Sequence, residues 1–91
     1  MAQQINRLRC IILTPDALVA EIRVDSVVLP CHDGMVGILP GHAPFLSILA
    51  GGPMRTRDAD NLQRVFFIDG GVVHVRSNKL TILTRSVRMS D

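Results

Sequence analysis

Aromatic side chains are scarce in this 91-residue chain, which has no Trp, no Tyr and three Phe. The interior must therefore be filled with aliphatic side chains, and the chain has no aromatic platform on which the bases of single-stranded nucleic acid could stack. Ten basic residues are nearly balanced by eight acidic ones, for a net charge of +2, and no basic run occurs. Nucleic acid is therefore not an expected partner.

Long apolar runs and cysteine pairs are missing as well. No stretch approaches the roughly 18 apolar residues of a membrane-spanning helix, and residues 1–4 lack the basic and apolar regions of a signal peptide. We expect a cytoplasmic protein that does not insert into lipid. Its two cysteines, Cys10 and Cys31, lie in strand-like surroundings and are expected to be buried, reduced thiols.

No motif for catalysis or metal binding is present. The three histidines and two cysteines show no C-x-x-C or H-x-x-x-H spacing, so we expect no metal site. Cys31 and His32 are neighbours whose side chains diverge on a strand, and no serine lies in a Gly-x-Ser-x-Gly elbow. The two Gly-Gly pairs lack the Lys-Ser/Thr of a phosphate-binding loop. We expect neither enzymatic activity nor a bound cofactor.

Short apolar runs separated by turn residues dominate the chain, and no segment has a helical period. This pattern predicts an all-β fold, a flattened antiparallel sandwich or barrel. We expect one domain over residues 1–84 and an irregular tail over residues 85–91. Ala50-Gly51-Gly52-Pro53 should break one strand and Gly70-Gly71 should bend the chain sharply. The expected strands cover residues 7–13, 18–25, 26–30, 35–39, 44–49, 54–57, 63–69, 72–76 and 79–84.

The stretch from Val27 to Leu46 combines strands with rigid turns. Asp33-Gly34 is a residue pair that tight hairpins favour. Further on, Pro40 and Pro44 flank Gly41-His42-Ala43, so this loop should be stiff, with Gly41 free to take a positive φ. The loop would present His42, whose imidazole is either incidental to the turn or part of a contact surface.

Three stretches together resemble a known family. They are Ser26 to Pro30 with Asp33 to Leu46, then Phe67-Ile68-Asp69-Gly70-Gly71-Val72-Val73-His74-Val75, and finally Asn78 to Leu83. They are similar to the epsilon subunit of bacterial F-type ATP synthase, called delta in mitochondria. The resemblance extends from Leu8 to Leu83.

The resemblance implies a flattened sandwich of about ten strands and a non-catalytic role in the central stalk. The expected partners are the gamma subunit and the polar loops of the membrane c-ring, with the alpha/beta catalytic head reached indirectly. The protein would be peripheral on the inner face of the bacterial membrane and would couple ion translocation to ATP synthesis. The implied contact residues are Asp33, Gly34, Met35, Leu39, Pro40, Gly41, His42, Ala43 and Pro44.

The chain departs from the family pattern at several points. Met35 stands where many relatives have an acidic residue, Asp69 replaces a serine, and His74 replaces a glutamate. The sequence stops at Asp91 without the two C-terminal helices that restrain ATP hydrolysis in relatives and bind ATP in some, so neither role is expected here. A free-standing β-sandwich that binds a peptide or small ligand is the alternative interpretation.

Overall fold

The computed structural model describes residues 7–90, and every regular element in this range is a β-strand. Residues 1–6 of the expected domain and Asp91 of the expected tail lie outside it. This part of the chain includes no helix long and apolar enough to cross a membrane. The eight strands are β1 (Leu8–Thr14), β2 (Ala17–Val24), β3 (Ser26–Cys31), β4 (Gly34–Ile38), β5 (Phe45–Arg57), β6 (Gln63–Arg76), β7 (Lys79–Leu83) and β8 (Val87–Met89).

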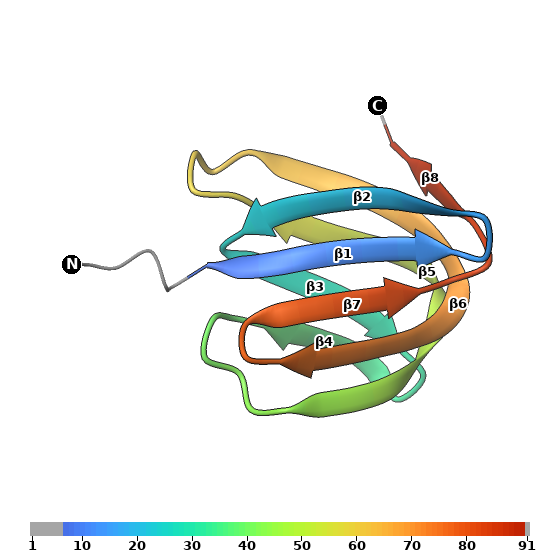
Figure 1. Cartoon of the computed structure of the whole chain (residues 1–91), viewed down its shortest axis with the longest axis horizontal. Coiled ribbons are helices and arrows are strands. Elements are labelled where there is room, and N and C mark those ends of the chain that lie inside the picture. Colours follow the sequence, from blue (N-terminus) through green and yellow to red (C-terminus); the bar gives the residue numbers. More distant parts are fainter. Residues whose placement is uncertain (1–6, 91) are drawn as a thin grey trace.

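The strands form one sheet folded into two layers (Figure 1). Neighbouring strands follow the order β2-β1-β7-β6-β5-β3-β4, with β8 paired to β6 outside this path. The front layer in Figure 1 contains β2, β1, β7, the C-terminal half of β6 and the N-terminal half of β5. The other halves of β6 and β5 form the back layer with β8, β3 and β4. The sheet does not close, since β2, β4 and β8 each pair with one strand only, and the expected all-β sandwich is confirmed.

Two long strands replace four expected short ones. The sequence predicts breaks at residues 50–53 and 70–71, but the β5–β6 ladder continues through this region, where Gly51 pairs with Asp69 and Gly52 with Ile68. Gly52, Gly70 and Gly71 have φ values of +146°, +69° and +117°, and the chain bends there without ending its hydrogen-bonded pairing. If the halves of these two strands are counted separately, the eight strands become ten, in agreement with the number of about ten that the resemblance implies.

The core lies between the layers and is almost entirely aliphatic. Val73, Val75, Leu80 and Ile82 are fully buried, so the β6–β7 hairpin turns these residues inward, as the alternation in this part of the sequence predicts. Both cysteines are buried free thiols, as expected. Burial raises the pKa of the Cys10 thiol to about 12, because an apolar interior disfavours the thiolate.

A β-bulge changes the outer half of β2. The alternation of β2 predicts that Leu18 points inward with Ala20 and Ile22, but Leu18 is 56% exposed. Ile12 pairs with Ala20 while Leu13 pairs with Leu18, so Val19 is the extra residue. One additional residue moves the side chains beyond it to the opposite face, and the prediction for Leu18 is therefore wrong.

Two further features differ from the sequence-based expectation. The expected irregular tail forms β8, whose Val87 and Met89 pair with Ile68 and Phe66 of β6. In addition, β1 and β7 pair in parallel, so the sheet is not purely antiparallel. Both pairings join segments distant in sequence, which local patterns do not reveal.

Candidate interaction surface

The loop from Leu39 to Pro44, here called the proline loop, connects β4 to β5. The His42 amide donates a hydrogen bond to the Leu39 carbonyl oxygen at 3.1 Å, and Gly41 has a φ of +87°. Proline at the second position and glycine at the third, with positive φ, define a type II turn. The predicted positive φ of Gly41 is confirmed.

Contacts made by Gly41 and His42 hold the proline loop in place. The Gly41 amide donates a hydrogen bond to Oδ1 of Asn78 at 2.7 Å, which ties the loop to the β6–β7 turn. The His42 ring lies edge-on to Phe45, with centroids 5.6 Å apart, and its Nδ1 is 2.7 Å from the Ala43 carbonyl oxygen. His42 is half-buried, so part of its imidazole remains accessible.

The β3–β4 turn carries the other predicted contact residues. His32 Nε2 lies 3.0 Å from Asp33 Oδ1, and the His32 amide donates to the Ile48 carbonyl oxygen at 2.9 Å. Gly34 has a φ of +125°, and the adjacent Met35 is 55% exposed. An apolar side chain therefore stands at the tip of this hairpin.

The structure separates the nine predicted contact residues into two groups. Asp33, Gly34 and Met35 lie at the start of β4, and the proline loop follows its end. A strand of five residues places these groups about 13 Å apart. Figure 1 shows them at opposite ends of β4, so one partner patch would have to extend along this edge strand to touch both.

An exposed apolar row crosses the outer face of the front layer, and sequence reasoning missed it. Strand register aligns one outward-facing residue from each of five strands: Ile48, Val72, Leu83, Leu13 and Leu18. Ile48 is 60% exposed, and Leu46, two residues before it on β5, is 72% exposed. Beside the row lies a hollow of about 640 Å³ lined by Pro15, Asp69, Gly71, Val72, Leu83, Thr84 and Arg85.

The signal for this apolar row is present in the sequence but cannot be interpreted without register. Val72 and Leu83 alternate with the buried Val73 and Ile82, so both faces of these strands appear apolar. Only the pairing shows that the outward residues line up. The bulge in β2 then adds Leu18 to the same face.

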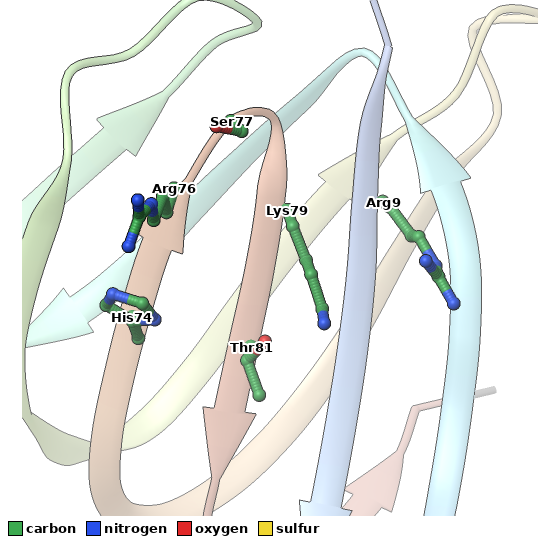
Figure 2. A pocket seen from close by; sticks show the side chains of 6 residues that line it. All are labelled: Arg9, His74, Arg76, Ser77, Lys79 and Thr81. Atoms are coloured by element: carbon green, nitrogen blue, oxygen red, sulfur yellow. The ribbon is translucent and has the colours of Figure 1, made fainter.

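A basic row lies on the same face. Arg76 pairs with Lys79, Lys79 with Arg9, and Arg9 with Arg23, which places four cations side by side on four strands. Figure 2 shows three of them around a hollow of about 440 Å³, together with His74, Ser77 and Thr81. The Arg9 guanidinium is paired with Glu21, with Nη2 and Oε2 2.6 Å apart.

Within residues 7–90, no three His, Cys, Asp or Glu side chains are grouped as metal ligands.

The two layers, joined by long bent strands, define a β-sandwich domain. The chain belongs to the family described as "ATP synthase, Delta/Epsilon chain, beta-sandwich domain", whose model matches residues 7–90. This confirms the family resemblance.

Individual relatives support the same assignment. The chain is 34% identical over 79 residues to an ATP synthase epsilon chain of Leptospira interrogans, a match that covers 87% of this chain and 61% of the relative. It is 40% identical over 80 residues to the ATP synthase epsilon chain of Nitratidesulfovibrio vulgaris, a match that covers 88% of this chain and 59% of the relative. The chain thus spans about 60% of the length of these relatives.

Two solved structures have the same fold. One chain of the Euglena gracilis mitochondrial ATP synthase, in a structure of OSCP, F1 and c-ring, matches with a TM-score of 0.87 at 20% identity over 92% of this chain and 54% of its own length. A chain from the central stalk and c-ring of the Tetrahymena thermophila mitochondrial ATP synthase matches with a TM-score of 0.73 at 18% identity. This match covers 89% of the present chain and 65% of the Tetrahymena chain.

Proposed function

We propose that this chain is a non-catalytic central-stalk subunit of an F-type ATP synthase, which binds the gamma subunit and the polar loops of the c-ring. In this role it couples ion translocation to ATP synthesis in the alpha/beta head. It would be peripheral on the inner face of the bacterial membrane, held there through the complex. The observation that carries the proposal is the exposed apolar row on the front layer of a sandwich that belongs to this family.

The apolar row is suited to the gamma subunit. Five aligned aliphatic residues on a flat sheet face form a contiguous apolar patch, and such patches on small soluble domains mark interaction sites. The hollow beside Val72 and Leu83 can accept an apolar side chain of the partner. Well-packed pockets of this kind supply much of the binding energy of protein interfaces.

The two ends of β4 provide further contacts in this proposal. The proline loop is fixed by its type II turn and by the bond to Asn78, so little conformational entropy is lost when it binds. At the other end, Met35 offers an apolar contact. We assign the nine residues of these segments to contacts with gamma and the c-ring loops.

Co-purification with gamma tests the proposal. The tagged chain should bring down the gamma subunit of the same source, together with the alpha and beta subunits. Leu46→Asp/Ile48→Asp places two charges on the apolar face and should weaken gamma binding by at least about tenfold. The matched control is Leu62→Asp/Met89→Asp, since both residues are also exposed and apolar but lie away from this face. The control should bind gamma normally.

Thermal unfolding followed by circular dichroism establishes that each variant is folded. Equal loss of gamma binding in both folded double variants would contradict a role for the apolar row. A wild-type chain that stays monomeric and never associates with gamma would overturn the proposal and favour the free-standing binding module.

A further inference from the structure

The cations of the basic row repel one another within the isolated chain. Directly paired like charges on neighbouring strands destabilise a sheet, and here Lys79 lies between Arg76 and Arg9. Within residues 7–90, Arg9 is the one member of the row with a carboxylate at ion-pair distance, that of Glu21. Among residues 7–90, no carboxylate forms an ion pair with Arg23, Arg76 or Lys79. Three positive charges therefore remain uncompensated on one face.

These side chains spread apart and do not converge on one point. Figure 2 shows Arg76 extending toward His74 on β6, Lys79 extending toward the gap between β7 and β1, and Arg9 reaching toward β2. A compact anion such as a single phosphate would contact one or two of them. Charge distributed over several strand spacings of about 4.8 Å matches the row better.

The basic row and the apolar row belong to one flat surface. On β7, Lys79 belongs to the basic row and Leu83 to the apolar row. These two residues are four positions apart, which is about 13 Å along a strand. Proteins that lie on membranes bury their apolar residues more deeply than their basic ones. Rows side by side on one sheet face instead fit a protein surface whose carboxylates lie beside its apolar contacts.

The geometry points to an acidic polypeptide segment of the partner docked across Arg76, Lys79 and Arg23, with the partner's apolar contacts about 13 Å away on the apolar row. This inference rests on the proposed function, because it takes the segment to belong to the gamma subunit. It adds the chemistry of the contact: aspartate and glutamate side chains of gamma neutralise the row and fix the orientation in which the two proteins meet.

Lys79 makes this inference directly testable, since it is the chain's sole lysine. A carbodiimide joins lysine amines to carboxylates without a spacer. In the complex of the full chain with gamma, it should link Lys79 to an aspartate or glutamate of gamma, identified by mass spectrometry and distinguished by mass from a link through the N-terminal amine. Lys79→Arg should still bind gamma but lose the cross-link.

Association kinetics supply a second readout. Arg76→Gln/Lys79→Gln should slow association with gamma about tenfold at low salt and flatten its salt dependence. Arg55→Gln/Arg57→Gln is the matched control, since both arginines are exposed on the back-layer half of β5. It should leave both quantities unchanged.

The outcomes separate the two proposals. Gamma binding without a Lys79 cross-link and with unchanged association of the Gln variant would overturn the acidic segment while leaving the proposed function intact. Failure of the wild-type chain to bind gamma would instead overturn the proposed function. Flotation of the wild-type chain with phosphatidylglycerol vesicles, lost in Arg76→Gln/Lys79→Gln, without a cross-link to gamma would assign the row to lipid and overturn the inference.

Discussion

Cys10 is a buried group whose ionisation makes the stability of this domain depend on alkaline pH. Its thiol is fully buried in the core, and burial raises its pKa from 9.0 to about 12. Between these values the unfolded chain releases a proton that the folded chain retains. The thiol therefore stabilises the fold below pH 9, and this contribution is lost as the pH rises toward 12.

We predict that the free energy of unfolding falls by about 1.4 kcal/mol per pH unit above pH 9 because of Cys10. Guanidinium unfolding followed by circular dichroism measures this, since the chain has no tryptophan to report by fluorescence. The lack of tyrosine and the single lysine leave few other groups that titrate in this range. Cys10→Ala should flatten the pH dependence, and an equally steep fall in that variant would contradict the assignment.

At the scale of the elements, the bend in β6 depends on Gly71. A Cβ added there would overlap the Leu83 carbonyl oxygen, and the φ of Gly71 is +117°. The close approach of β6 to the end of β7 therefore requires the absence of a side chain. The same bend carries Val72 onto the outer face and Val73 into the core.

Gly71→Ala should destabilise the domain by at least about 2 kcal/mol, because it combines backbone strain with overlap against the neighbouring strand. This corresponds to a fall in the unfolding temperature of roughly 10 °C, measured by circular dichroism. Gly37→Ala is the control, since its Cβ would meet nothing within 4 Å and its φ is not positive. Equal stability of the two variants would contradict the requirement for glycine at position 71.

The elements also separate what local sequence predicts from what it does not. The alternation of apolar and polar residues predicts most of the strands, and the Pro40-Gly41 pair predicts a turn, because both features depend on residues that are neighbours in the chain. The pairing of β8 with β6 depends on a partner distant in sequence, and the exposure of Leu18 depends on the register of β2 against β1, so neither could be predicted from local alternation. The nine residues at the ends of β4 were suggested by resemblance to relatives, and their role as contacts stays a prediction. The two rows emerged only from strand register.

For the molecule as a whole, charge is unevenly distributed. The front face carries the basic row, in which cations lie next to one another. Elsewhere, arginines such as Arg7 and Arg85 are each paired with a carboxylate, that of Asp25 and Asp69 respectively. The front face of the isolated domain thus carries neighbouring like charges that oppose its stability.

Removing one charge from this surface should therefore stabilise the isolated domain. At low ionic strength, Lys79→Gln should raise the free energy of unfolding by about 0.5 kcal/mol, and the gain should disappear near 1 M salt, where screening extends over only about 3 Å. Denaturant unfolding at both salt concentrations measures the effect. Arg55→Gln, outside the row, should produce no such gain; a gain equal to that of Lys79→Gln would contradict the effect of the row.

The long strands β5 and β6 have a mechanical consequence. Because each runs through both layers, a sideways load on the front face passes into the back layer along covalent backbone and does not rely on side-chain contacts between the layers. The two layers cannot slide past one another without stretching or distorting these two strands. A force applied at the apolar row is therefore transmitted to β3 and β4 through the continuous backbone of β5 and β6, with little sliding of one layer over the other.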